Sequence, residues 1–353
     1  MKYELASPAA AVRVAAGLLV AVAGLAIAFR RVDFQALVAA LRDAHWSWFA
    51  GAVAALIVSF LVRAWRWQLL LEPIERIGIE PLFSATMIGY FGNSVLPLRL
   101  GELMRAVAIG RRRGGLDAST ALGSIGVERL LDVASALVVA AAVVPLAGGL
   151  GGGVGASAGA ATLVAMVLVG LFWASRAPRV RRMVATRAEA GGDGRVAGLA
   201  RSFLRGLLIL GERPALLPIA LGTVILWLIY GAVLWASARA AGLTLSPLDT
   251  GLVLVANTVA VSVPAAPGYV GTYHAAVVLV TSEVLGQPLA QAQVFAILAH
   301  ASSWLPMVAI GALCLLRSSL RLADVRELAP EADAGGALDV TTREPGDRGG
   351  TRC

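Results

Sequence analysis

The chain carries, at residues 89–105, the segment GYFGNSVLPLRLGELMR. It combines helix-breaking Gly, Asn and Pro residues with ionisable side chains, in a sequence that is otherwise largely apolar. In hydrocarbon an unsatisfied backbone group costs several kcal/mol, and an ionised side chain costs about 2.5–3.5 kcal/mol on insertion scales. Such a segment is stable only where protein or water surrounds it. We therefore predict that it lines a polar cavity within a membrane protein.

Long apolar runs surround this segment. The 353 residues are 58% hydrophobic and 15% charged, with a mean hydropathy of +0.78. Two apolar segments, 82–110 and 248–286, are interrupted by Gly, Pro and Asn and are predicted to be broken or re-entrant helices. The sequence thus predicts an all-α, polytopic membrane protein with about eight membrane helices. Six uninterrupted runs are long enough to cross a hydrocarbon core about 30 Å thick, namely 11–29, 47–71, 127–147, 155–175, 215–240 and 291–316.

The positive charge predicts an orientation. The formal net charge is +8, and the cations are almost all arginines gathered in short loops, most densely in 176–213. The positive-inside rule places that loop in the cytoplasm, and counting spans from it puts both termini there too. The chain then divides into a membrane domain, 1–322, and a polar tail, 323–353, predicted to be disordered. We find no nucleic-acid motif, so nucleic acid is not an expected partner.

Two arginines, Arg63 and Arg66, share one helix face in the run RAWRW. Two explanations stay open. The tryptophans and arginines would form an anchoring belt at the cytoplasmic membrane surface. Alternatively, the planar guanidinium groups would bind the phosphate of a phospholipid or polyprenyl-phosphate headgroup.

Charges spaced by three residues follow in the quoted segment, at Arg99, Glu102 and Arg105. They can form a ladder of ion pairs along one helix, and free amides at the helix start favour an anion. We interpret them as a lipid-headgroup site, with simple neutralisation by Glu102 near the cytoplasmic surface as the structural alternative. Residues that bend or end a helix occur at the same place, namely Gly92, Asn93, Pro97 and Gly101.

Three further charges lie close together in VERLLDVAS, where Glu128 and Asp132 share a helix face with Arg129 nearby. Left unpaired at the bilayer midplane, they would cost about 7–10 kcal/mol. That is comparable to the stability of a whole domain. They must therefore be paired or close to water. We expect pairing with Arg99 or Arg105, with placement in the first cytoplasmic turn as the alternative.

The second interrupted segment contains SVPAAPGYVGTYHAA. His274 follows its breaks and is either a hydrogen-bonded packing residue or a proton-relay or headgroup residue. His300, with Ser302 and Ser303 nearby, predicts an interhelical polar patch. Two opposed broken elements are what alternating access to a midplane site uses. The hinge residues here are Pro264, Pro267, Gly268 and Gly271.

These motifs resemble the lysylphosphatidylglycerol synthase transmembrane region family, also called flippase-like domain proteins. The resemblance extends over about residues 10–320 and implies a bacterial inner-membrane protein with about eight membrane helices. It relates the chain to the flippase half of bifunctional aminoacyl-phosphatidylglycerol synthases. His274 stands where many relatives carry Glu. The matching motifs, in order, are RAWRW (63–67), GYFGNSVLPLRLGELMRA (89–106), VERLLDVAS (127–135) and PAAPGYVGTYHAA (264–276).

Together these features predict a lipid flippase or transporter that binds or moves an anionic phospholipid or an isoprenoid-linked lipid. The alternative is a membrane-embedded transferase or accessory subunit that acts on lipid-linked substrates in envelope biogenesis. A non-catalytic scaffold for an envelope-assembly enzyme is a third hypothesis.

Several catalytic signatures are missing from the sequence. It has no G-x-x-x-x-G-K-[ST], H-E-x-x-H or G-x-S-x-G motif, so we expect no ATP-driven pump, no catalytic residues of these kinds, no cofactor and no metal. The tail 323–353 is too short for an aminoacyltransferase domain, so lysyl transfer is not expected. The expected partners are membrane lipids, including an anionic phospholipid or a lipid-linked glycan. A second copy of the chain and an envelope-biosynthesis enzyme are left open.

Overall fold

The computed structural model describes most of the membrane domain. Helices account for nearly all of this part of the chain, and it contains no β-strand, which confirms the all-α prediction. The predicted tail, 323–353, lies outside it. The described ranges are 8–29, 32–96, 100–110, 116, 118–147, 216–262 and 267–318, with side chains described for all but 8–17 and Ser119.

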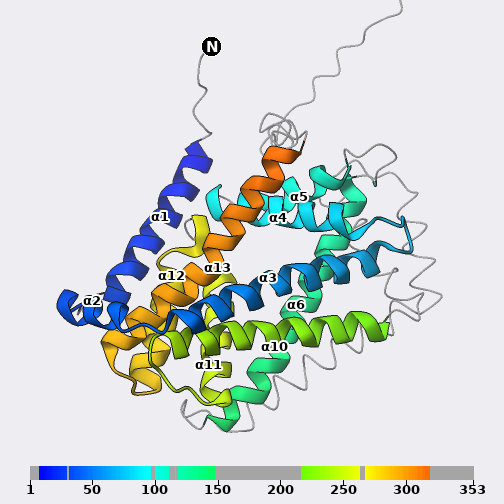
Figure 1. Ribbon diagram of the computed structural model, residues 1–353. Helices are drawn as coiled ribbons and strands as arrows, with labels where there is room; N and C mark the ends of the chain where they lie inside the picture. Colours follow the sequence, from blue (N-terminus) through cyan, green and yellow to red (C-terminus); the bar gives the residue numbers. More distant parts are fainter. Residues whose placement is uncertain are drawn as a thin grey trace, which may run out of the picture. The chain divides into compact units, whose positions relative to one another are not determined.

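Figure 1 shows the helices in the order of the chain. They are α1 (Pro8–Phe29), α2 (Phe34–Arg42), α3 (Trp46–Leu71), α4 (Ile79–Val95), α5 (Gly101–Gly110), α6 (Ala118–Leu146), α10 (Leu216–Ala240), α11 (Pro247–Ser262), the 3₁₀ turn η2 (Pro267–Tyr269), α12 (Thr272–Leu279), the π turn η3 (Val280–Val284) and α13 (Leu289–Arg317).

Four helices of the described ranges are long and apolar enough to cross a membrane: α3, most of α6, α10 and α13. They coincide with four of the predicted spans, and a fifth, 11–29, lies within α1. Helix α6 starts nine residues before the predicted position of 127, because the small and polar residues of 118–126 interrupt the apolar run without ending the helix. The predicted span 155–175 lies outside the described residues. The chain is a multi-pass helical membrane protein.

Both predicted interruptions separate helices. The first lies between α4 and α5, where Leu96 has an extended backbone with φ −94° and ψ 145°. Proline disfavours the helical conformation in the residue before it, so Pro97 accounts for the end of α4. The second lies between α11 and η2. Pro97 and Pro264 themselves lie outside the described residues.

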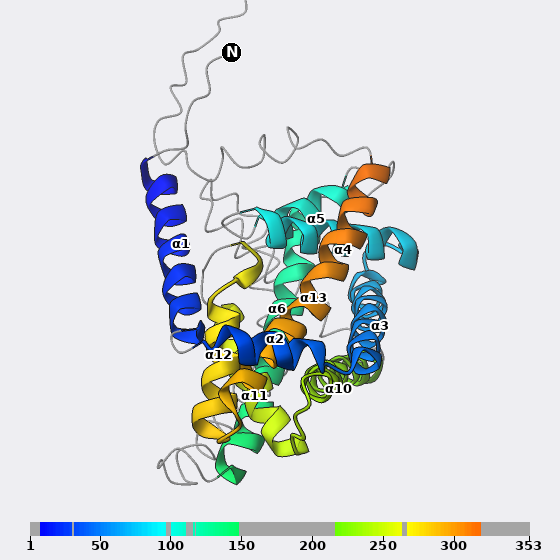
Figure 2. The same cartoon turned by 60° about the vertical axis from the view of Figure 1, so that its left-hand side comes forward.

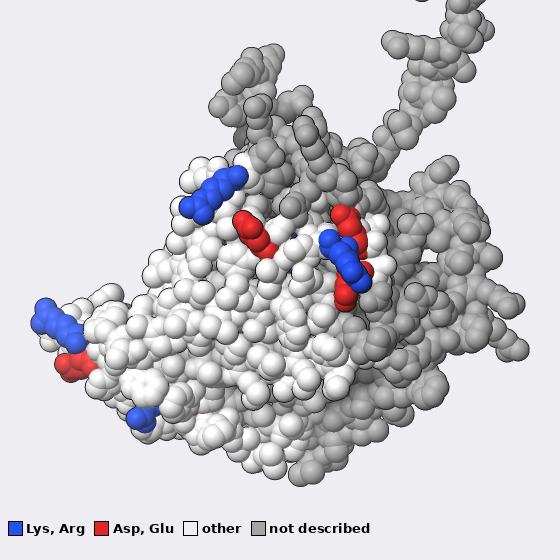
Figure 3. Space-filling model, turned by 45° about the vertical axis from the view of Figure 1, so that its right-hand side comes forward, with Lys and Arg blue, Asp and Glu red and all other residues white. Residues whose placement is uncertain are grey.

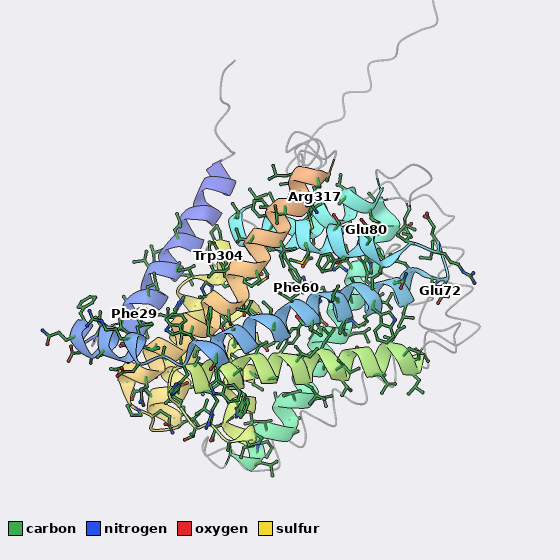
Figure 4. All side chains as sticks on the ribbon, viewed as in Figure 1. Phe29, Phe60, Glu72, Glu80, Trp304 and Arg317 are labelled. Carbon is green, nitrogen blue, oxygen red and sulfur yellow. The ribbon has the colours of Figure 1, made fainter. Side chains whose placement is uncertain are left out.

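The helices pack into a bundle in which α3 and α10 lie side by side over their length (Figures 1 and 2). Helix α4 packs between α5 and α13, and α12 lies against α1 and α13. Apolar side chains fill the space between them, as around Phe60, which is buried with Met87 (Figure 4). On the face drawn in Figure 3, the described surface is nearly all uncharged. An apolar exterior is what a lipid-facing surface requires.

Candidate functional site

Charged side chains from three helices meet inside this apolar bundle. A buried charge is stable only when it is paired, because removal from water costs several kcal/mol per ion. Four of the side chains, on Arg63, Arg66, Arg105 and Glu128, are 7% exposed or less. We call the whole set the charge network: Arg63 and Arg66 on α3, Glu102 and Arg105 on α5, and Glu128, Arg129 and Asp132 on α6.

Glu128 lies at the centre of the network. Both terminal nitrogens of Arg105 donate to its carboxylate, at 3.1 and 2.9 Å, and Arg63 donates to the same group at 2.5 Å. The predicted pairing of Glu128 with Arg105 is thus confirmed. The Arg105 guanidinium also lies 3.7 Å from the ring centroid of Trp67, and the Trp67 indole nitrogen donates to Ser124 at 2.9 Å. A carboxylate and an aromatic face together hold Arg105 in place.

Asp132 binds the two arginines of α3. Arg63 donates to one carboxylate oxygen at 3.0 Å and Arg66 to the other at 2.7 Å. Helix α10 completes these contacts, because Tyr230 accepts from Arg63 at 2.8 Å and Thr223 accepts from Arg66 at 3.2 Å. Both arginines are buried, so their guanidinium groups do not form an interfacial belt. They join α3 to α6 and α10.

The accessible part of the network is the pair Glu102–Arg129. Their side chains are 36% and 41% exposed, and Arg129 donates from its Nε to Glu102 at 2.8 Å. Asp132, at 19%, is the next most exposed of the three carboxylates. Of the expected ladder, the two described members, Glu102 and Arg105, each pair with a residue of α6. Arg99 lies outside the described residues.

The network holds more positive than negative charge. Within the described ranges it contains four arginines and three carboxylates, an excess of one positive charge. The Nε atoms of Arg63, Arg66 and Arg105 are buried without a hydrogen-bond partner. An uncompensated cation in a low-dielectric interior is unfavourable alone, so an anion near the exposed edge would stabilise it.

The break between α4 and α5, which we call the first hinge, places Arg105 beside Glu128. The Asn93 side-chain oxygen accepts a hydrogen bond from the Gly101 amide at 3.0 Å, so Asn93 satisfies the free start of α5. A Cβ on Gly101 would overlap the Gly89 carbonyl oxygen, and one on Gly92 would lie 2.8 Å from the Gly101 Cα. These glycines allow α4 and α5 to cross in close contact. Asn93 therefore positions α5, the helix that carries Glu102 and Arg105.

The second hinge, residues 267–271 between α11 and α12, has a backbone with several positive φ angles. Gly268, Tyr269 and Gly271 have positive φ angles of 70°, 58° and 95°. A Cβ on Gly268 would lie 2.7 Å from the Trp304 indole nitrogen and 3.3 Å from the Ser94 carbonyl oxygen (Figure 4 labels Trp304 on α13). Ser94 lies in the last turn of α4, and this helix packs against η2, so the two broken elements are neighbours.

His274 is not part of the charge network. It lies on α12 among Phe29, Tyr273 and His300. The predicted interhelical patch around His300 is confirmed, because His300 Nε2 lies 2.8 Å from the Gly268 carbonyl oxygen, and Ser302 and Ser237 are within hydrogen-bond distance at 3.4 Å. The histidines thus form a separate polar group at the second hinge.

An apolar groove lies next to the charge network, between α6, α10 and α11. Its volume is about 900 Å³, and its walls include Leu131, Trp227 and Leu254. Thr223 lines the groove and also accepts the hydrogen bond from Arg66. A charged group and an apolar groove are therefore adjacent, which is the arrangement that an amphipathic molecule requires.

Sequence reasoning did not find the contributions of α10 and of the buried aromatics. Thr223, Tyr230 and Trp67 occur in long apolar runs, and nothing in their spacing distinguishes them from packing or interface residues. The available signal was weak: polar side chains inside a span must find a partner, and buried arginines need more acceptors than two carboxylates provide.

Comparison with known proteins gives two results. Glycosyltransferase AglD of Haloferax volcanii is 31% identical to this chain over 125 residues, which are 35% of the chain and 20% of that protein. The chain thus matches about a fifth of that relative's length. A family model described as the lysylphosphatidylglycerol synthase TM region matches residues 14–311, a range that includes the charge network and both broken elements. The chain belongs to the lysylphosphatidylglycerol synthase TM region family, as its motifs predicted.

Proposed function

We propose that this protein binds the anionic headgroup of a membrane lipid at the exposed edge of the charge network and moves the lipid between leaflets. The lipid is an anionic phospholipid or an isoprenoid-linked lipid. One observation carries the proposal: a network with one excess arginine lies directly beside an apolar groove, and Thr223 lines the groove and accepts a hydrogen bond from Arg66 of the network. The network suits a phosphate group and the groove suits a hydrocarbon chain.

The arginines have different roles in this proposal. Arg63, Arg66 and Arg105 are buried and held by carboxylates, so they supply the positive field. Arg129 is the accessible arginine of the network, and a phosphate would displace Glu102 from it. A guanidinium group binds phosphate through two parallel hydrogen bonds, which offsets the loss of one carboxylate.

Movement between leaflets requires the site to open to both sides in turn. The two broken elements pack against each other where η2, with Gly268, lies beside Ser94 in the last turn of α4. A change in the conformation of one hinge therefore alters the packing of the other. Discontinuous helices that meet at midplane are a recurrent means of alternating access in transporters. We place the protein in a bacterial inner membrane with both termini in the cytoplasm, in keeping with the family and the arginine-rich loops.

A reconstitution experiment tests the proposal. Purified protein in proteoliposomes would carry trace fluorescent phosphatidylglycerol, and a membrane-impermeant quencher would report its movement between leaflets. Arg129→Gln removes a charged hydrogen bond that is worth about 1.5–3 kcal/mol, which should slow movement by about ten- to a hundredfold. Arg42→Gln is the matched control, because Arg42 is an exposed arginine at the end of α2, outside the network.

A second candidate is a membrane-embedded transferase or accessory subunit that acts on lipid-linked glycans. The similarity to a glycosyltransferase favours it, and the partly exposed carboxylates of Glu102 and Asp132 would serve as general bases. The same proteoliposomes separate the two. Movement with no change in lipid mass supports the flippase, and a mass change that depends on Glu102 supports the transferase. If the protein neither moves nor modifies any lipid offered, both are wrong.

A further inference from the structure

The second hinge contains a pair of histidines that the lipid site does not use. The chain has three histidines in all. His274 on α12 and His300 on α13 lie with ring centroids 4.8 Å apart and planes inclined by 56°. The third, His45, is exposed before the start of α3. We refer to His274 and His300 as the histidine pair.

The hydrogen bond to the hinge fixes the proton on one ring. A carbonyl oxygen only accepts, so the contact between His300 Nε2 and the Gly268 carbonyl requires a hydrogen on Nε2. In the neutral His300 ring, Nδ1 is then the acceptor nitrogen. His274 is 8% exposed, and its Nδ1 is buried without a hydrogen-bond partner. The pair therefore offers open proton acceptors inside the bundle.

Burial of His274 opposes a charge on the ring, so the pair would hold at most one proton. Tyr273 lies against both rings, with centroids 5.0 Å from His300 and 6.0 Å from His274, and the Phe29 ring lies 6.2 Å from His274. Aromatic faces stabilise one imidazolium, but two cations this close would repel. In the described ranges neither histidine has an ion-pair partner. Other titratable groups on the neighbouring elements are Tyr269 on η2, Asp249 on α11 and Glu283 on η3.

We propose that the histidine pair is a proton-binding site that takes up one proton with each anionic lipid that the protein moves. This inference rests on the proposed lipid movement. One proton balances the single negative charge of a phosphodiester, so the pair makes each cycle electrically neutral. Histidine chains of this kind mark proton paths in pumps and transporters.

The hinge is the element that would sense the proton. A protonated His300 donates a stronger, charge-assisted bond to the Gly268 carbonyl and so stabilises the hinge as seen here. Loss of the proton weakens that bond. Gly268 and Tyr269 have positive φ angles, and Gly268 lies next to α4. When the hydrogen bond weakens, the hinge can change conformation and move relative to the first broken element. Proton release and lipid release are thereby linked.

Proton binding can be measured without any transport. Nitrogen-15 histidine NMR of the labelled protein in bilayers would follow all three rings across about pH 5 to 8, with His45→Gln assigning the exposed ring. We expect the pair to gain one proton in total and His300→Gln to abolish the shared titration. Two neutral rings throughout this range, or two independent protons, would reject the site.

Transport then tests the coupling. With the membrane potential clamped, a pH difference should drive fluorescent phosphatidylglycerol into one leaflet, by about tenfold for each pH unit if one proton accompanies each lipid. The asymmetry should vanish in His300→Gln, whose side-chain amide still donates to Gly268 but cannot be protonated. His45→Gln should keep the wild-type asymmetry. If the wild-type protein moves lipid equally with and without the pH difference, the coupling is rejected but the proposed lipid movement stands. If it moves no lipid at all, the proposed function is overturned.

Discussion

At the scale of single residues, the stability of this site depends on matching each buried charge. Glu128 accepts from two arginines, with a third at 3.7 Å, and at 1% exposed it is the most buried carboxylate of the network. The sequence allowed this pairing to be predicted, since unpaired charges in a span are too costly. It did not give the pairing partners of Asp132, because α3 and α6 are brought together only by the fold.

Glu128→Gln should destabilise the protein strongly. The change keeps the shape but leaves Arg63 and Arg105 without their shared negative charge in a buried place. Removing one partner of a buried pair costs about 3–5 kcal/mol. Thermal unfolding in detergent would show it as a lower midpoint. Glu283→Gln, on η3 and remote from the network in sequence, is a control of the same chemistry, and equal stability of both variants would contradict the role given to Glu128.

At the scale of helices, the breaks in the sequence predicted the breaks in the structure. Proline and the residue before it explain the end of α4, and the close glycines explain how α5 returns against it. The start of α6 depends on tertiary contacts, which the sequence pattern does not show. The start of α6 was misplaced because the Ser, Thr and Gly residues of 118–126 interrupt the apolar run, although the helix continues through them and buries Ala121 and Ile125.

Gly101→Ala should separate α4 from α5. Its Cβ would overlap the Gly89 carbonyl oxygen, which is backbone and cannot rotate away. We expect a loss of about 1–3 kcal/mol from overpacking, together with slower lipid movement as Arg105 is displaced.

Gly51→Ala is the matched control for this prediction. Gly51 lies in α3, and a Cβ there has no atom within 4 Å. Unfolding in detergent and the transport assay would compare the two variants. A Gly101→Ala protein as stable and active as Gly51→Ala would show that the close crossing is not needed.

At the scale of the whole molecule, the charge network and the apolar groove act as one site because α10 borders both. Sequence alone predicted a membrane bundle with a polar interior. It could not predict the groove, because a surface formed by α6, α10 and α11 depends on how segments distant in sequence pack together.

Filling the groove should weaken lipid binding without disturbing the charges. Gly231 lines the groove, and a Cβ there would meet no atom within 4 Å. Gly231→Phe should therefore reduce the amount of lipid that co-purifies and slow its movement, while the midpoint of unfolding stays near that of the wild type. Gly51→Phe introduces the same ring at an open position of α3, and an equal loss of lipid in both variants would argue against the groove.

The packing of η2 against α4 has a consequence for chimaeric proteins. The two interrupted segments have complementary packing surfaces. A single segment taken from a relative would therefore pack poorly against the other segment of this chain. Grafting either segment alone from another family member should yield an inserted but inert protein. Grafting both together should restore transport, which makes the two segments a single heritable unit although more than 130 residues of chain separate them.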